Sequence, residues 1–309
     1  MKLLLSKPRG FCAGVVRAID TVEKALKLWG PPIYVKHHIV HNRHVVENLE
    51  RKGAIFVEEL SEIPKGSRVI YSAHGISPAV RVEAKTRELI EIDASCGLVI
   101  RVHSAAKRFA KKGYHILLIG HKNHVEVIGT AGEAPEQTTI LESLEDVERL
   151  SFPKEQPLFY LTQTTLSLDD VEEVTQALKE KYPHVETLPS SSICYATTNR
   201  QLALKEIVSS IELLLVVGDP TSSNSNRLKE VALKRGVPGY LVNEASEIDP
   251  SWFDKLSVIG LTAGASTPEP VVQECISRLK MLGVIDTEEV EFTEENVFFA
   301  LPREVLGSP

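Results

Sequence analysis

Three of the four cysteines in this sequence, Cys12, Cys96 and Cys194, occur in the same local context. Each follows an extended or strand-like run and begins a helix-like one. A helix N-terminus carries partial positive charge and free N–H groups, which favour a thiolate over a thiol. If the fold brings them together, three thiolates can hold a soft metal or an iron–sulfur cluster, and with a histidine they suit zinc equally well. Cys275 lies at apolar helical spacing and is expected in the core.

Three histidines, His41, His74 and His124, follow strand-like runs, where a parallel α/β fold binds its ligands. Histidine can donate to a phosphate oxygen, bind a metal or move a proton near neutral pH. Each of them, taken alone, is more typical of a surface or capping histidine. That plain interpretation is kept for His37, His38, His44, His103, His115 and His184.

Glu126 lies two residues after His124, and in an extended loop this spacing directs both side chains the same way. A glutamate beside anion-binding groups can deliver a proton to a leaving oxygen. By itself, the motif is weak evidence, and an exposed loop glutamate is the default interpretation. The H-x-E pattern also occurs in zinc deaminases, but their closely spaced C-x-x-C pair is absent from this sequence.

The segment from Thr221 to Asn226 has Ser or Asn at five of its six positions and enters a helix-like run. One helix cap needs one such residue, so the excess favours an oxyanion or phosphate site at the helix start. Residues 162–165 (Thr-Gln-Thr-Thr) and Ser266-Thr267 are by default capping residues. Neither a G-x-G-x-x-G fingerprint nor a P-loop occurs.

The composition bounds the class of protein. The chain has 309 residues, 43% of them hydrophobic and 25% charged, with a formal net charge of −7. These values indicate two or three compact globular units and argue against general nucleic-acid binding. No apolar run has the length of a membrane span or of a signal-peptide core. Four widely spaced cysteines do not resemble a disulfide framework, so we expect a cytoplasmic protein with no membrane partner.

Strand-like and helix-like patterns alternate along the chain, which predicts an α/β fold with parallel sheets. The predicted strands are 33–39, 68–72, 114–119, 158–161, 213–217, 239–242 and 257–262. The predicted helices are 14–28, 42–52, 78–90, 98–112, 168–181, 197–210, 224–235 and 268–282. The cysteine contexts divide this pattern into α/β lobes at 12–95 (with an N-terminal strand in 1–11), 96–193 and 194–282, followed by a tail, 283–309, that packs onto the body.

A set of motifs runs in order from about residue 8 to 268 and covers most of the chain. They are P-R-G-F-C-A-G-V, I-V-H-N, S-A-H-G, D-A-S-C, H-x-x-H-V-E-V-I-G-T, T-Q-T-T-L-S, I-C-Y-A-T-T-N-R-Q, S-S-N-S-N-R-L and T-A-G-A-S-T-P. In these motifs the sequence closely resembles the 4-hydroxy-3-methylbut-2-enyl diphosphate reductases, the last enzymes of the non-mevalonate isoprenoid pathway.

This resemblance implies three pseudo-threefold-related lobes around a central iron–sulfur site. It implies a [4Fe-4S] cluster held by Cys12, Cys96 and Cys194, with one open iron for the substrate's allylic oxygen. Ferredoxin or flavodoxin would deliver two electrons, one at a time. The hydroxyl would leave as water, giving isopentenyl and dimethylallyl diphosphate.

The resemblance also implies roles for individual side chains. Glu126 would be the proton donor, and Thr164 would position the substrate hydroxyl or relay the proton. The diphosphate would be held by His41, His74, His124, Ser222, Ser223, Asn224 and Ser266.

The sequence departs from the family pattern at several loop positions. Gly97 and Val125 stand where proline is expected, and Asn123 where glycine is usual. Residues 219–221 (Asp-Pro-Thr) replace a serine-containing stretch, and residues 191–192 are both serine where an acidic residue is common. None of these departures removes a proposed ligand or the proton donor.

Three other interpretations stay open from the residues alone. One is a three-cysteine iron–sulfur dehydratase of the quinolinate synthase kind, which needs no reductant. Another is an iron–sulfur sensor or carrier, which leaves Glu126 and the Ser/Asn segment without a role. The third is a structural zinc site.

Overall fold

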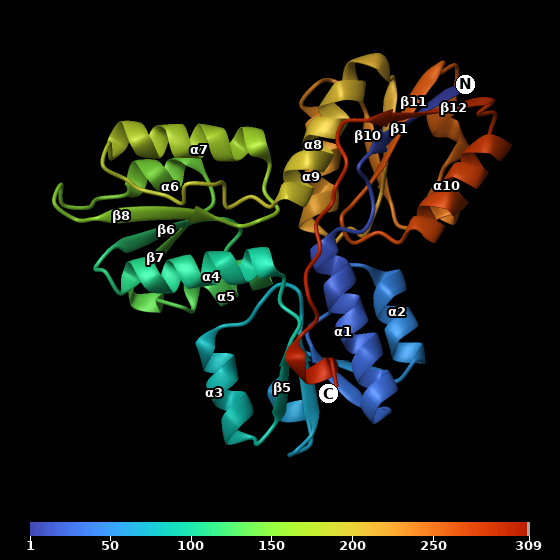
Figure 1. Cartoon of the computed structure of the whole chain (residues 1–309). Helices are drawn as coiled ribbons and strands as arrows, with labels where there is room; N and C mark the ends of the chain where they lie inside the picture. Colours follow the sequence, from blue (N-terminus) through green and yellow to red (C-terminus); the bar gives the residue numbers. More distant parts are fainter. Residues whose placement is uncertain (308–309) are drawn as a thin grey trace. The chain divides into compact units, whose positions relative to one another are not determined.

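The computed structural model describes residues 1–307, and these form three parallel β-sheets flanked by helices, which confirms the predicted α/β fold (Figure 1). Sheet A has five strands. In spatial order they are β10 (Gly239–Val242), β9 (Leu213–Val217), β11 (Val258–Ala263), β1 (Lys2–Lys7) and β12 (Asp286–Glu291).

Sheets B and C are smaller. Sheet B has the order β3 (Ala54–Val57), β2 (Ile33–Lys36), β4 (Arg68–Tyr71) and β5 (Ile90–Asp93). Sheet C has the order β7 (Thr138–Leu141), β6 (His115–Ile119) and β8 (Leu158–Thr162). Within each sheet, all the paired strands run parallel.

The connecting segments are largely helical, as crossovers between parallel strands require. The α-helices of residues 1–307 are α1 (Ala13–Trp29), α2 (Arg43–Arg51), α3 (Pro78–Thr86), α4 (Gly97–Ala110), α5 (Val125–Ala131), α6 (Leu144–Arg149), α7 (Leu168–Lys181), α8 (Tyr195–Ile207), α9 (Ser223–Leu233) and α10 (Glu269–Met281). None of them combines the length and apolarity that a membrane span requires.

Burial follows the position of each strand within its sheet. The interior strand β9 has the sequence LLLVV and every residue buried, as expected where helices cover both faces of a parallel sheet. The edge strand β12 has the sequence DTEEVE and is almost wholly exposed. Its glutamates pair with lysines of β1, Glu288 with Lys2 at 2.5 Å and Glu291 with Lys7 at 3.2 Å. A charged edge of this kind discourages pairing with further strands.

Each of the three predicted ligand cysteines stands where the chain leaves one sheet for a helix that packs on another. Cys12 follows β1 of sheet A, and Arg17 of the next helix, α1, donates to two carbonyl oxygens at and just beyond the end of β5 in sheet B. Cys96 follows β5, and the next helix, α4, packs on sheet C. Cys194 follows a segment that bridges to β8 of sheet C, and the next helix, α8, packs on sheet A.

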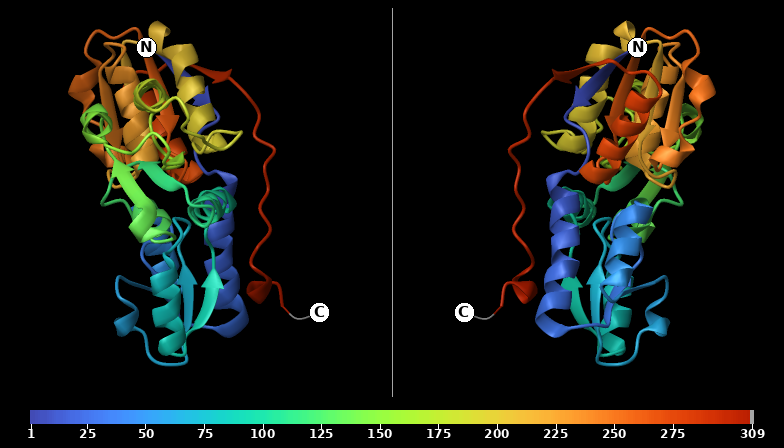
Figure 2. Two further views of the ribbon diagram at one scale, coloured as in Figure 1. Left: turned by 90° about the vertical axis from the view of Figure 1, so that its left-hand side faces the viewer. Right: turned by 90° about the vertical axis from the view of Figure 1, so that its right-hand side faces the viewer.

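The chain divides into two compact units. The first contains residues 1–15, 41–45 and 195–298, with sheet A; the second contains residues 16–40, 46–194 and 299–309, with sheets B and C. The N-terminal strand, assigned to the lobe of residues 12–95 from the sequence, instead pairs with β11 and β12 in sheet A. The segment 283–309 was predicted as a tail, but its residues Asp286–Glu291 form the edge strand β12, and residues 292–302 then form neither helix nor strand (Figure 2).

Candidate active site

The three cysteines are anchored in the same way. In each case the main-chain N–H donates to a carbonyl oxygen in the loop that follows a neighbouring parallel strand, which is β11, β4 or β8. The bonds are Cys12 to Ala265 (3.2 Å), Cys96 to Ala73 (3.0 Å) and Cys194 to Thr164 (3.1 Å). The register of each sheet therefore fixes the cysteine at its carboxyl edge, where parallel α/β folds bind ligands.

The chemistry of these residues fits an iron–sulfur cluster. All four cysteines are free, and Cys12, Cys96 and Cys194 are partly exposed, directly before or at the N-cap of α1, α4 and α8. Positive helix ends complement negatively charged sulfur ligands, and thiolates are the usual ligands of iron–sulfur clusters. Cys275 is fully buried in α10, and burial raises the pKa of its thiol to about 12. It is a core residue, as predicted.

Glu126 and Thr164 form a buried pair within the second unit. The carboxylate of Glu126 accepts the Thr164 N–H at Oε1 (2.6 Å) and the Thr164 hydroxyl at Oε2 (2.8 Å). Glu126 is only 2% exposed. Burial raises the pKa of this carboxyl, and it outweighs the opposing effects of the two Thr164 hydrogen bonds and the nearby charge of His103. A buried carboxylic acid with a raised pKa is a suitable proton donor near neutral pH.

The local structure around Glu126 differs from the extended loop that we predicted. His124 is the N-cap residue of α5, and its Nδ1 accepts the N–H of Glu126 at 3.2 Å. Because Nδ1 is the acceptor in this bond, the neutral ring carries its proton on Nε2 and can donate it to an anion. The extended prediction was wrong because a histidine cap starts the helix one residue before the glutamate.

The structure brings His74 close to His124. Their ring centroids are 6.1 Å apart in an edge-to-face arrangement. The Nδ1 atom of His74 lies 3.2 Å from the hydroxyl of Ser72, which follows β4. Two of the three predicted diphosphate histidines thus lie side by side in the second unit.

The Ser/Asn segment lies at the start of α9 in the first unit. Ser222 is the N-cap residue and accepts the N–H of Ser225 at 3.3 Å. Asn224 is buried, and its Oδ1 accepts the N–H of Ala265 at 2.9 Å. Ala265 in turn accepts the N–H of Cys12. Ser222 therefore caps the helix, whereas Asn224 supports the loop that anchors Cys12. Ser223, the first residue of α9, is partly exposed.

Two hydrogen bonds hold the segment of His41 to the rest of the first unit. Its carbonyl accepts the hydroxyl of the buried Ser266 at 2.9 Å. Two residues further on, the Arg43 N–H donates to Oδ2 of Asp219 at 2.9 Å. Burial alone would raise the pKa of Asp219, but hydrogen bonds from Thr221 and Arg43, together with the nearby His41, hold it below its usual value. In the sequence, Asp219 stands out only as a departure from the family pattern, and no spacing signal ties it to residues 41–43.

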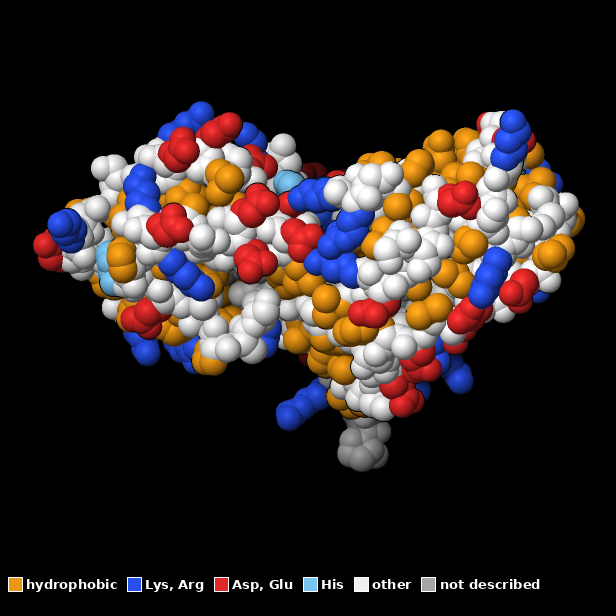
Figure 3. Space-filling view, turned by 90° about the horizontal axis from the view of Figure 1, so that it is seen from above, with side chains coloured by type: hydrophobic (Ala, Val, Ile, Leu, Met, Phe, Trp, Pro, Cys, Tyr) orange, Lys and Arg blue, Asp and Glu red, His pale blue; other side chains and the backbone are white. Residues whose placement is uncertain are grey.

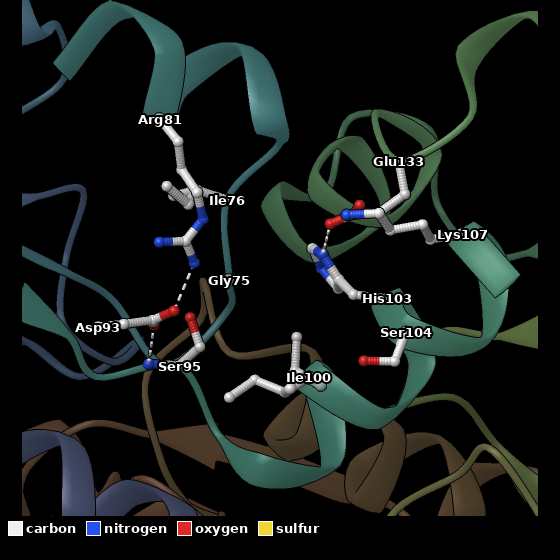
Figure 4. A pocket seen from close by; sticks show the side chains of 11 residues that line it. Gly75, Ile76, Arg81, Asp93, Ser95, Ile100, His103, Ser104, Lys107 and Glu133 are labelled. Atoms are coloured by element: carbon white, nitrogen blue, oxygen red, sulfur yellow. Dashed lines mark hydrogen bonds and ion pairs between the residues drawn. The ribbon is translucent and has the colours of Figure 1, made fainter. Parts of the chain in front are cut away.

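A cavity of about 170 Å³ lies in the second unit, lined by side chains other than the predicted site residues (Figure 4). One side carries an ion pair between Arg81 and Asp93. The other carries His103, whose Nδ1 lies 3.0 Å from Oε1 of Glu133. His103 is only 8% exposed, so its interpretation as a surface or capping residue was wrong. Its spacing from Val99 on the apolar face of α4 could have shown this.

Comparison with known proteins identifies the family. The family model described as LytB protein matches residues 3–280. The chain belongs to the LytB family. It is 67% identical to the 4-hydroxy-3-methylbut-2-enyl diphosphate reductase of Protochlamydia amoebophila (strain UWE25), over 100% of this chain and 98% of the relative. It is 61% identical to the reductase of the same name from Chlamydia pneumoniae, over 99% of both chains.

Solved structures agree with the sequence relatives. The E-1-hydroxy-2-methyl-but-2-enyl-4-diphosphate reductase of Plasmodium falciparum is 50% identical and superposes with a TM-score of 0.95, over 99% of this chain and 96% of that one. A second structure, titled as the terminal enzyme of the non-mevalonate pathway, is 31% identical with a TM-score of 0.65, over 91% of this chain and 99% of that one. LytB proteins are iron–sulfur enzymes, in keeping with the free cysteines described above.

Proposed function

We propose that this protein is an iron–sulfur oxidoreductase that removes the allylic hydroxyl of (E)-4-hydroxy-3-methylbut-2-enyl diphosphate. The substrate takes up two electrons and two protons, the carbon–oxygen bond breaks, and water leaves. The products are isopentenyl diphosphate and dimethylallyl diphosphate. The full-length similarity to reductases of this name supports the assignment.

The observation that carries the proposal is the position of Thr164. Its carbonyl accepts the N–H of Cys194, while its own N–H and hydroxyl donate to the carboxylate of Glu126. One residue thus connects a proposed cluster ligand to the proposed acid. Proton delivery and cluster binding are fixed to the same strand end, as a reaction that combines protonation with reduction requires.

Glu126 is the proposed source of the proton that leaves with the hydroxyl. Burial keeps this carboxyl protonated to higher pH than an exposed glutamate. The hydroxyl of Thr164 lies 2.8 Å from Oε2 of Glu126 and can both donate and accept a hydrogen bond. It is therefore placed to pass the proton on or to orient the substrate hydroxyl.

Cys12, Cys96 and Cys194 are the proposed ligands of a [4Fe-4S] cluster that keeps one iron without a protein ligand. When bound, the cluster supplies the electrons, one at a time from ferredoxin or flavodoxin, and a Lewis-acidic iron for the hydroxyl oxygen. The diphosphate is a handle remote from the reacting carbon, and its binding energy orients the alcohol. Its proposed ligands are His41, His74, His124, Ser222, Ser223, Asn224 and Ser266.

Turnover under anaerobic conditions tests the proposal. Protein reconstituted with iron and sulfide is given the allylic diphosphate, with and without a low-potential one-electron reductant, and the two products are measured by mass spectrometry. Both diphosphate products are expected, in amounts that depend on the reductant. Turnover that does not need a reductant would favour a dehydratase, and a stable cluster with no turnover would favour a sensor or carrier.

The identity of the metal needs a separate measurement. Anaerobic purification followed by visible absorption and Mössbauer spectroscopy is expected to show an iron–sulfur cluster. One zinc per chain with no visible absorption would contradict the proposed cluster, since three thiolates also suit zinc.

A further inference from the structure

Arg200 in α8 is a completely buried cation, and its exposed fraction is 0%. Its Nη1 atom donates to Oε1 of Glu295 at 3.0 Å and to the carbonyl of Ala196 at 2.9 Å. Its Nη2 atom donates to the carbonyl of Gly10 at 2.7 Å and to Oε2 of Glu295 at 3.3 Å. All four residues belong to the first compact unit. The guanidinium therefore connects α8, the segment before Cys12 and the C-terminal tail.

Glu295 supplies the negative charge that this buried cation requires. A buried ion that loses its partner is strongly destabilised, because its desolvation is no longer compensated. Glu295 comes from the tail after β12, where residues 292–302 form neither helix nor strand (Figure 2). Its carboxylate is fixed further by Asn199, whose Nδ2 donates to Oε1 at 3.0 Å. A segment without regular structure thus provides a fixed, largely buried charge.

Side chains of α8 hold the segment that carries Cys12 both before and after the cysteine. Before the cysteine, the carbonyl of Gly10 is held by Arg200, and Gly10 has a φ of +69°, which few other residues adopt. After the cysteine, the N–H of Ala13 donates to the Tyr195 hydroxyl at 3.1 Å. Both anchors come from α8, so α8 side chains hold the Cys12 segment on either side of the bond from the Cys12 N–H to Ala265.

We propose that Glu295 is a positioning residue for the Cys12 segment and acts through Arg200. Without the carboxylate, the guanidinium moves toward water and releases the carbonyl of Gly10, and the Cys12 segment loosens. The inference rests on the proposed function only in giving Cys12 its role as a cluster ligand. In this way the C-terminal tail supports the proposed active site although none of its residues is a proposed ligand of the substrate.

Hydrogen–deuterium exchange on the iron-free protein tests the inference directly. Its readout is the main-chain N–H groups of Gly10, Cys12 and Ala13, which are hydrogen-bonded in the intact segment. Glu295→Gln is expected to speed their exchange on the order of tenfold, because a charge-assisted anchor is lost. The matched control is Glu294→Gln, which removes the same charge from an exposed neighbour and is expected to leave exchange unchanged.

Further arms separate the possible outcomes. Exchange in β6, in the other unit, is expected to stay constant, which distinguishes local loosening from global unfolding. Glu295→Asp keeps a carboxylate and is expected to give an intermediate rate; it also serves if Glu295→Gln does not fold. After reconstitution, Glu295→Gln is expected to lose iron to a chelator faster than Glu294→Gln.

Equal exchange at residues 10–13 in all the variants would overturn the inference. So would faster exchange in Glu295→Gln that is just as large in β6. A wild-type protein without reductase activity would instead contradict the proposed function, and the exchange comparison would still stand.

Discussion

Glu126→Gln is expected to abolish most turnover while leaving the fold intact, and the geometry of the Thr164 pair explains both effects. Glutamine keeps an oxygen for the Thr164 N–H, which lies 2.6 Å from Oε1 in the wild type. Its amide nitrogen replaces Oε2, which faces the Thr164 hydroxyl at 2.8 Å. A hydroxyl can accept as well as donate, so both bonds are preserved. The change in the free energy of unfolding should stay within about 1 kcal/mol.

The effect on rate has a different size. An amide cannot release a proton, and the loss of a general acid typically costs about 10²- to 10⁴-fold in rate, or roughly 3–5 kcal/mol of barrier. The assay is reductant-dependent turnover of the reconstituted variant, with its visible spectrum recorded as a control for the cluster. A variant with the wild-type spectrum and more than about a third of the wild-type rate would refute the role of Glu126 as proton donor.

Stability against pH gives a second check on the same residue. Burial raises the pKa of Glu126 above its ordinary value of 4.5, so the folded protein keeps a proton that the unfolded chain releases. The wild type therefore loses stability as the pH rises from the ordinary value through the raised one, whereas Glu126→Gln does not. In denaturant titrations of the iron-free proteins, the free energy of unfolding of the variant should rise relative to that of the wild type as the pH increases across this range. A constant difference would contradict the raised pKa.

Further substitutions test the surroundings of the site. Cys12→Ser is expected to lose most of its bound iron and visible absorption. Cys275→Ser should keep both, because Cys275 of α10 is buried in the hydrophobic core. Asp219→Asn weakens the bond to the Arg43 N–H, which holds the segment of the proposed diphosphate ligand His41, and is expected to raise KM about tenfold with kcat nearly constant; a change confined to kcat would contradict this positioning of His41 by Asp219. The stabilising effect of Asp219 should be present above its ordinary pKa of 3.8 and lost as the pH falls through its lowered value, so variant and wild type should converge in stability in acid. Gly97→Ala is expected to lower the melting temperature because its methyl group would lie 3.1 Å from the Phe299 ring, and Phe299→Ala should relieve at least about 0.5 kcal/mol of that loss; strictly additive losses would refute the contact.

The sequence predicts the interior strands well and the edge strands poorly. Strands such as β9 are continuous apolar runs because both faces are covered, and the predicted range 213–217 is the observed one. The acidic strand β12 has no apolar alternation that would predict a strand. It is held in the sheet by parallel pairing with β1 and by ion pairs with the lysines of β1. Short strands such as β5 follow a helix so closely that the helical pattern runs into them. Pairing between distant segments also sets the sheet to which β1 belongs, and no local pattern contains it.

In the candidate site, too, features set by local sequence could be predicted, and contacts between distant segments could not. Cysteines before helices, and polar residues after strands, are visible in the sequence because each depends on the local alternation of strand and helix. The bond between Asp219 and Arg43 joins residues 176 positions apart, and that between Arg200 and Glu295 joins residues 95 apart. Neither pair has a spacing that marks it. Such contacts come from the way sheet A gathers segments from both ends of the chain.

The loops that anchor the cysteines also carry residues proposed to act on the substrate. The carbonyl that accepts the Cys96 N–H belongs to Ala73, next to His74, and the one that accepts the Cys12 N–H belongs to Ala265, next to Ser266. For Cys194 the anchoring residue is Thr164 itself. In all three sheets, therefore, one main-chain hydrogen bond separates a proposed cluster ligand from a proposed substrate residue. A shift in any one of these strand ends must therefore move a proposed cluster ligand and a proposed substrate residue together.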